Sequence, residues 1–166
     1  GNVILYKSDL FPYKWTKHKT VVENKKLYDA TPFEHNGKWF CFASERSKAT
    51  LTPNDLLQLY ILEDGPLGSW KEHPASPIKI DVRGGRSAGK VFQKEGRTFR
   101  PAQLGAPKYG YAIQLYEILH LDEFNYEECL VDTIFPNWRK ENLATHTFNQ
   151  ARGWQFIDSQ QLVRKI

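Results

Sequence analysis

The sequence predicts an all-β fold of the β-propeller type, represented by about three blades of four-stranded antiparallel sheet. Three observations lead to this prediction. The dipeptide Leu-Tyr begins at Leu5, Leu59 and Leu115, at spacings of 54 and 56 residues, which is close to the ~40–50 residues of a propeller blade. Turn signals separate short strand-like runs along the chain. Long amphipathic helical patterns do not occur in the sequence.

The first half of the chain contains the outer part of one predicted blade and most of a second. β-Branched and aromatic residues alternate with polar ones in each run, as expected for strands with one buried face. Asn36-Gly37 is the strongest short hairpin signal. The predicted strands are residues 3–6, 15–22, 31–34, 39–43 and 55–62, followed by one that starts at Trp70 and is restricted to a sheet edge by Pro74 and Pro77.

The second half repeats this order. Residues 94–96 and Arg152-Gly153 supply two further hairpin turns. The predicted strands are residues 89–93, 97–101, 109–119, 126–134, 144–150 and 154–158. An apolar or aromatic residue recurs at one place in each copy, at Phe33, Phe92 and Phe148, and these positions are assigned to the innermost strands.

Composition narrows the possible classes of protein. Of the 166 residues, 40% are hydrophobic and 14% aromatic, enough for a folded core. No apolar run is long enough to cross a bilayer, so this segment is predicted not to be transmembrane. The net charge of +4 is spread thinly, and no nucleic-acid partner is expected. The chain contains no Met and opens in a strand-like run, which indicates a portion of a longer protein.

Cysteine and histidine spacing argues against a metal site. Cys41 and Cys129 lie far apart, each in a strand-like run, and are predicted to be buried thiols, with a disulfide left open. No Cys-x-x-Cys or His-x-x-x-His pair occurs. No metal and no cofactor are therefore expected.

Several short motifs resemble one known family. They are Asp29-Ala-Thr-Pro-Phe33, Arg86-Ser-Ala-Gly-Lys90, Arg100-Pro-Ala-Gln103, Tyr109-Gly110 and His146-Thr-Phe-Asn149. Together they resemble the five-bladed propeller domain that is similar to glycoside hydrolase family 43 and forms the N-terminal domain of glucosamine inositolphosphorylceramide transferase and its bacterial relatives. The resemblance implies that residues 1–166 form a single domain, the C-terminal portion of a partial five-bladed propeller.

The resemblance also implies a site at the central funnel. It places Asp29 and His146 at the starts of innermost strands, where related hydrolases carry an Asp that tunes the catalytic acid and a His that faces the channel. The blade between them offers Arg86 where a general acid would be expected. Asp29 and Glu45 are the candidate catalytic residues. An inverting glycosidase needs an acid and a base ~6.5–9.5 Å apart, and these residues do not complete that set.

The candidate substrate-binding residues are Arg86, Gln103, Tyr109, His146 and Trp138. Structural alternatives stay open for several candidates. Asp29 could cap a turn or pair with Arg86, and Glu45 and Gln103 could satisfy backbone groups between blades. Trp138 lies outside the repeat and is the candidate sugar platform, whereas Trp39, Trp70 and Trp154 follow the repeat and are predicted to pack the blades.

The leading functional prediction is a carbohydrate-active or carbohydrate-binding propeller that is accessory to glycan or glycolipid processing. Its expected partners are a carbohydrate or glycolipid headgroup and an associated glycosyltransferase or formyltransferase-like domain. Two alternatives are a glycoside hydrolase whose catalytic acid and base lie in upstream blades, and a non-catalytic interaction scaffold. Fold alone does not choose among them.

Overall fold

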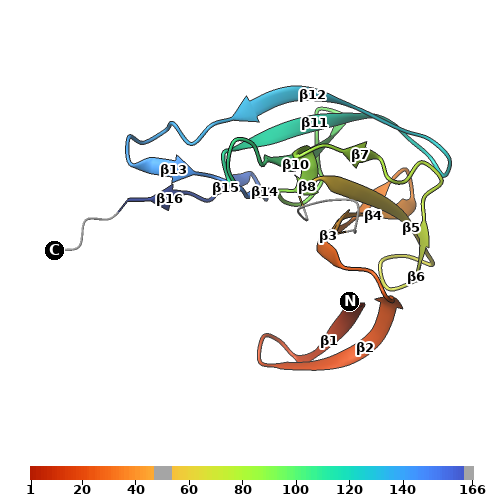
Figure 1. Cartoon of the computed structure of the whole chain (residues 1–166). Helices are drawn as coiled ribbons and strands as arrows, with labels where there is room; N and C mark the ends of the chain where they lie inside the picture. Colours follow the sequence, from red (N-terminus) through yellow and green to blue (C-terminus); the bar gives the residue numbers. More distant parts are fainter. Residues whose placement is uncertain (47–53, 163–166) are drawn as a thin grey trace.

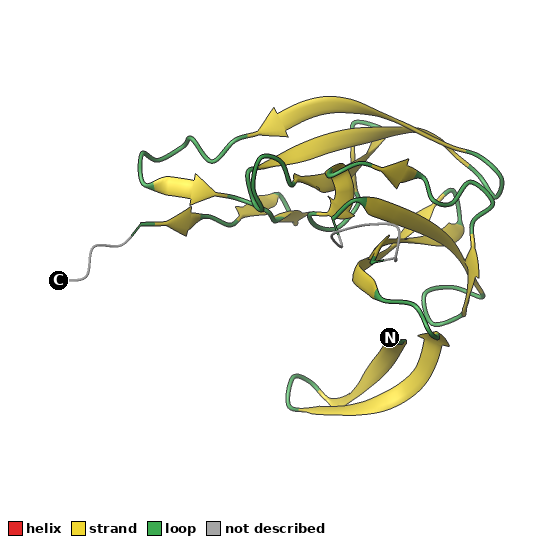
Figure 2. Ribbon diagram, in the orientation of Figure 1, coloured by secondary structure: helices red, strands yellow, loops and turns green. Residues whose placement is uncertain are grey.

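The computed structural model describes residues 1–46 and 54–162. In this part of the chain the regular structure is entirely β-strand (Figure 2), which confirms the predicted all-β class. None of the described residues forms a helix that could cross a membrane. In chain order the strands are β1 (Val3–Leu10), β2 (Lys14–Val22), β3 (Leu27–His35), β4 (Lys38–Glu45), β5 (Leu56–Glu63), β6 (Ser69–Glu72), β7 (Lys79–Ile80), β8 (Arg83–Ser87), β9 (Phe92–Lys94), β10 (Arg97–Leu104), β11 (Ala112–Leu121), β12 (Tyr126–Ile134), β13 (Asn142–Ala144), β14 (Phe148–Ala151), β15 (Trp154–Ile157) and β16 (Gln160–Gln161).

The strands form two larger sheets flanked by smaller ones (Figure 1). The first has the order β3-β4-β5-β6, with β7 paired to β5, and the second has the order β8-β10-β11-β12, with β9 paired to β10. The pairs β1–β2, β14–β15 and β13–β16 are two-stranded. Every recorded pairing within the larger sheets is antiparallel. Sequential antiparallel meanders flanked by partial sheets agree with a partial propeller.

The three leucines of the repeat lie on β1, β5 and β11. Each of these strands is the first of a hairpin, formed with β2, β6 and β12 respectively. The Leu-Tyr recurrence therefore follows the order of the strands within the sheets.

Three tight turns join the inner strands as predicted. Asn36-Gly37, Glu95-Gly96 and Arg152-Gly153 connect β3 to β4, β9 to β10 and β14 to β15. Both residues of each turn have positive φ, between 50° and 81°. This is the pattern of a type I′ turn, whose twist matches that of the flanking strands.

The inner strand of the second large sheet differs from the prediction. A continuous strand over residues 89–93 was expected, but β8 ends at Ser87 and β9 begins at Phe92. Between them the chain leaves β10 to meet β14, where the Phe148 N–H donates to the Ala88 carbonyl at 2.7 Å. A Cβ at Gly89 would lie 1.9 Å from the Phe148 oxygen, so the glycine permits this close approach and breaks the strand.

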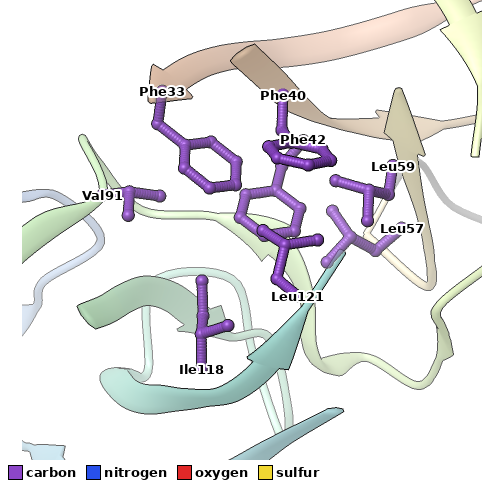
Figure 3. Packing of buried hydrophobic residues seen from close by; sticks show 8 residues of the cluster. All are labelled: Phe33, Phe40, Phe42, Leu57, Leu59, Val91, Ile118 and Leu121. Atoms are coloured by element: carbon purple, nitrogen blue, oxygen red, sulfur yellow. The ribbon is translucent and has the colours of Figure 1, made fainter. Parts of the chain in front are cut away.

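The two large sheets meet through what we call the apolar cluster (Figure 3). It contains buried side chains from β3, β4, β5 and β11, together with Val91. Its eight members are Phe33, Phe40, Phe42, Leu57, Leu59, Val91, Ile118 and Leu121. The rings of Phe33 and Phe42 stack with centroids 4.7 Å apart and planes 14° from parallel, a distance within the range that aromatic pairs favour.

A second contact between the same sheets is ionic, and we call it the ion network: Lys79, Arg100, Tyr116, Tyr126 and Glu128. Arg100 is buried and binds Glu128 in bidentate fashion, through Nε at 2.8 Å and Nη2 at 2.7 Å. Lys79 Nζ lies 2.8 Å from Glu128 Oε1 and also lies over the Tyr116 ring. Burial, the largest single influence, would raise the pKa of Glu128, but the charges and hydrogen bonds of Arg100 and Lys79 together outweigh it and lower the pKa to about 2.

Both cysteines are free thiols. Cys41 is buried and Cys129 only partly so, which corrects the expectation that both would be buried. Burial raises the pKa of the Cys41 thiol far above its ordinary value, so this side chain behaves as a small hydrophobic residue.

Candidate functional site

Five of the predicted site residues line one pocket of about 260 Å³. They come from β3, β8, β10 and the segments before β11 and β14. The predicted members are Asp29, Arg86, Gln103, Tyr109 and His146, and the others are Ala30, Thr31, Ser87, Ala88, Gly89 and Thr147. Asp29, Arg86 and His146 are 57 and 60 residues apart in sequence, so strand packing alone brings them to a shared cavity.

Asp29 reaches the pocket through a β-bulge. The register of β3 against β4 shifts between Tyr28 and Thr31, and Asp29 itself has a φ of 52°. A positive φ is uncommon outside glycine and costs backbone energy. Thr31 Oγ1 donates to the Asp29 carbonyl at 2.8 Å and helps to hold the bulge. Bulges of this kind re-aim a side chain.

Arg86 lies across the bulge from Asp29. Its Nε donates to Asp29 Oδ2 at 2.5 Å, and its Nη1 donates to Asn54 Oδ1 at 2.8 Å. Its guanidinium carbon is 5.5 Å from the centroid of the Tyr109 ring, within the range of a cation–π contact. Asp29, Asn54 and Tyr109 thus contact the planar guanidinium of Arg86. The side chain is only 18% exposed.

Gln103 and Tyr109 complete the wall next to Arg86. Gln103 is paired with Arg86 across β8 and β10, and its Nε2 donates to the Ser87 carbonyl at 3.0 Å. Tyr109 precedes Gly110, whose carbonyl accepts a bond from the Thr145 N–H at 2.8 Å. The Tyr109 ring meets His146 edge-on, with centroids 5.3 Å apart.

His146 is oriented by Asp158, a residue that the sequence analysis did not identify. The Nδ1 atom of His146 lies against Oδ2 of Asp158. The N–H groups of His146 and Thr147 donate to Oδ1 of the same carboxylate at 2.9 and 2.8 Å. Burial works against the charged carboxylate, but these bonds and the His146 side chain outweigh it and hold the pKa of Asp158 below its ordinary value.

This pairing determines what His146 can do. Because Nδ1 is engaged by Asp158, Nε2 is the ring nitrogen through which His146 can bond a ligand. His146 and Tyr109 also line a neighbouring cavity of about 280 Å³ together with Asp158. Asp158 could have been identified from its position: it follows the hairpin that begins just after His146, and the two ends of a hairpin lie side by side.

Glu45 and Trp138 lie outside the pocket lining. Glu45 accepts a bond from Gln58 Nε2 at 2.6 Å, and its carboxylate is 3.8 Å from Lys25 Nζ. Trp138 is exposed in the segment between β12 and β13. The pocket therefore brings together Asp29 and four of the five predicted binding residues, without these two.

The prediction for the three repeat tryptophans needs a correction. Trp39 and Trp70 pack against a buried cluster around Cys41 and Tyr60, as expected. Trp154 is 72% exposed, so the prediction that it packs a blade was wrong. The physical reason is that β14 and β15 form only a two-stranded sheet, and all four residues of β15 are exposed.

The pocket offers hydrogen-bonding groups of both kinds. Asp29 is the one carboxylate among the described residues that line the pocket. Its negative charge faces the positive charge of Arg86. No group of three or more His, Cys, Asp or Glu side chains able to hold a metal occurs in residues 1–46 and 54–162. Such a mixture of polar groups beside an aromatic ring suits a ligand rich in hydroxyl groups.

The fold and the pocket define a class: an all-β protein built of successive antiparallel blades, with polar side chains gathered where the inner strands meet. Comparison with known families makes the assignment specific. The family described as "Glucosamine inositolphosphorylceramide transferase 1, N-terminal" matches residues 1–165. The chain belongs to this family.

Plant relatives show the same relationship. The chain is 32% identical over 160 residues to Glucosamine inositolphosphorylceramide transferase 1 of Oryza sativa subsp. japonica, a match that covers 95% of this chain and 21% of the relative. It is 30% identical over 130 residues to the protein of the same name from Arabidopsis thaliana, covering 77% of this chain and 17% of the relative. The chain thus spans about a fifth of the length of these relatives. No solved structure matches it.

Proposed function

We propose that this chain is part of a carbohydrate-binding propeller that serves glycan or glycolipid processing and does not itself hydrolyse glycosides. The observation that carries the proposal is the state of Asp29. It is the one carboxylate among the described lining residues, and it is bound to Arg86. A glycosidase of the usual kind needs two carboxyl groups, one of them protonated.

The neighbouring groups do not replace the missing acid. Arg86 stays charged and has no proton to give at any working pH. Asp158 lies in the adjoining cavity, and its lowered pKa keeps it ionised. Glu45 is engaged by Gln58 and Lys25. The lining therefore supports binding rather than acid-catalysed bond cleavage.

The binding chemistry fits a sugar or a sugar-like headgroup. Asp29 can accept bonds from hydroxyl groups, and Gln103, Tyr109 and His146 can both donate and accept. Because Arg86 balances the charge of Asp29, the pocket does not demand a charged ligand. The relatives' name contains both glucosamine and inositolphosphorylceramide. A glycolipid headgroup presented to a transferase domain elsewhere in a longer chain is consistent with both facts.

The test has a catalytic and a binding part. The purified chain is offered a panel of aryl glycosides, for which no turnover is expected, and its binding of glucosamine and of myo-inositol is followed by ligand-observed NMR. Asp29→Asn should weaken binding about tenfold, as expected for the loss of a charged acceptor. Glu34→Gln, an exposed carboxylate on the same strand, is the matched control and should leave binding unchanged.

The other outcomes identify the alternatives. Turnover that disappears in Asp29→Asn or Glu45→Gln would show a working glycosidase. Absence of both turnover and sugar binding would favour the interaction scaffold.

A further inference from the structure

A further cavity lies away from Asp29 and has no role in the function proposed above. It is a groove of about 650 Å³ lined by residues 90–93 on one side and 150–155 on the other. We call it the Trp154 groove. Its ten lining residues are Lys90, Val91, Phe92, Gln93, Gln150, Ala151, Arg152, Gly153, Trp154 and Gln155. It therefore lies between the β9 segment and the β14–β15 hairpin.

The walls of the groove are fixed relative to each other. Just before the groove, the Lys90 N–H donates to Asn149 Oδ1 at 2.9 Å, and Gly89 allows the two segments to touch. Phe92 packs against Phe99 and Phe148, with ring centroids 5.4 and 5.7 Å apart. A preformed groove of this kind loses little conformational entropy when a ligand binds.

The lining has a distinctive chemistry. Trp154 presents a largely exposed ring. Gln93, Gln150 and Gln155 add amides to the same lining, and the last two, paired with each other, lie on the opposite face of the hairpin from Trp154. Lys90 and Arg152 add two positive charges, and none of the ten lining residues is acidic. Exposed aromatic rings with a wet edge are suited to binding because they offer apolar area with few rotatable bonds.

We propose that the Trp154 groove binds an acidic saccharide, with one sugar ring stacked on Trp154 and with Lys90 and Arg152 facing its carboxylate, sulfate or phosphate group. The groove is a second site, distinct from the Asp29 pocket. The Asp29 pocket is charge-balanced by its own salt bridge, whereas the described lining of the groove contains two cations and no carboxylate. The two sites thus differ in the charge of the ligand that they favour, which is neutral for the Asp29 pocket and negative for the Trp154 groove.

The experiment uses the whole chain and follows Trp fluorescence during titration with trigalacturonic acid. Galactotriose, the same sugar without carboxylates, is the comparison ligand. Wild-type protein should bind the acidic trisaccharide at least about tenfold more tightly than the neutral one, with binding weakened by added salt. Equal affinity for the two sugars, or no binding of either, would overturn the proposal.

Two sets of variants locate the binding. Trp154→Ala should weaken binding of trigalacturonic acid about tenfold or more, while Phe124→Ala, which removes another highly exposed aromatic side chain, should leave it unchanged. Lys90→Gln with Arg152→Gln should weaken it about five- to tenfold at low salt, whereas Lys71→Gln with Lys140→Gln should not. Because Trp154 is exposed, its replacement should leave the fold intact. Urea unfolding curves of each variant check this.

The remaining outcomes also decide the matter. Unchanged affinity in Trp154→Ala would contradict the groove as the site. A dimer in solution that dissociates in Trp154→Ala would show that the groove is a protein contact instead. Asp29→Asn should leave this binding intact, so failure of the sugar pocket and failure of the groove are separate results.

Discussion

The two large sheets are held together by two contacts of opposite character. The apolar cluster joins them through eight buried hydrophobic side chains, whereas in the ion network Lys79 on β7 reaches across to Glu128, which Arg100 holds within the second sheet. The contacts are adjacent, because Tyr126 packs on the apolar cluster and its hydroxyl donates to Glu128 at 2.5 Å. The same interface therefore shows two ways of burying side chains.

The difference lies in how each contact fails. When a buried apolar side chain is truncated, the free energy of unfolding falls in proportion to the volume removed, because each atom contributes a small, nearly independent amount. A buried ion pair is close to all-or-none, because removal of one partner leaves the other charge buried and unpaired. We expect the ion network to fix the relative position of the sheets, and the apolar cluster to supply most of the stabilising free energy.

Removal of Arg100 should give the largest effect. Arg100→Met keeps the volume of the side chain but leaves Glu128 buried without its bidentate partner. We expect a loss of about 3–5 kcal/mol in the free energy of unfolding, measured by urea denaturation.

The double variant Arg100→Met with Glu128→Met tests the cause. Replacing both partners by apolar groups should recover most of the lost stability. A double variant as unstable as the single one would show that Arg100 acts through packing, including its stacking over Tyr116, rather than through its charge.

Truncation within the apolar cluster should cost somewhat less. Leu59→Ala opens a cavity at a fully buried position, and we expect a loss of about 2–4 kcal/mol by the same measurement. Leu67→Ala, at an exposed position, is the control and should change stability little. A cost for Leu59→Ala below that of Leu67→Ala would mean that the cluster does not hold the sheets.

The contrast between these contacts also marks what the sequence could predict. The Leu-Tyr repeat and the three positive-φ turns follow from local patterns, because Gly, Asn and strand periodicity act over a few residues. The sequence leaves open a pairing of Asp29 with Arg86, 57 residues away, and the structure contains that salt bridge.

Other contacts could not be read from the sequence. Nothing local to Arg100 points to Glu128, because this pair depends on how β10, β11 and β12 align within one sheet. His146 meets Asp158 because the β14–β15 hairpin returns the chain to its starting point. Trp154 follows the repeat as closely as Trp39 does, yet it is exposed. The repeat predicts position within a hairpin, and burial depends on whether a neighbouring strand covers that hairpin.

The pH dependence of stability should separate the two contacts. The pKa of Glu128 is lowered in the folded state to about 2, so its ion pair stabilises the fold fully above the unfolded value near 4.5 and loses this contribution as pH falls toward 2. We expect a loss on the order of 2 kcal/mol across this window, followed by urea denaturation at several pH values.

The ion-pair-free double variant is the control for this pH effect. Its slope should be reduced between pH 4.5 and 2, with the remainder due to carboxyl groups such as Asp158 and Asp81, whose pKa values are also lowered. An unchanged slope would mean that Glu128 is not the titrating group.

Lys79 should give the smallest effect and the finest test of the comparison. It bonds Glu128 at 2.8 Å and lies 3.9 Å from the centroid of the Tyr116 ring, but Arg100 already pairs with Glu128. Lys79→Met keeps the aliphatic stem, so we expect a loss of only about 1 kcal/mol. In the Arg100→Met background, Lys79 still pairs with Glu128, and its removal should cost distinctly more. Equal costs in both backgrounds, measured as a double-mutant cycle, would show that the two cations act independently and that the network is not a single unit.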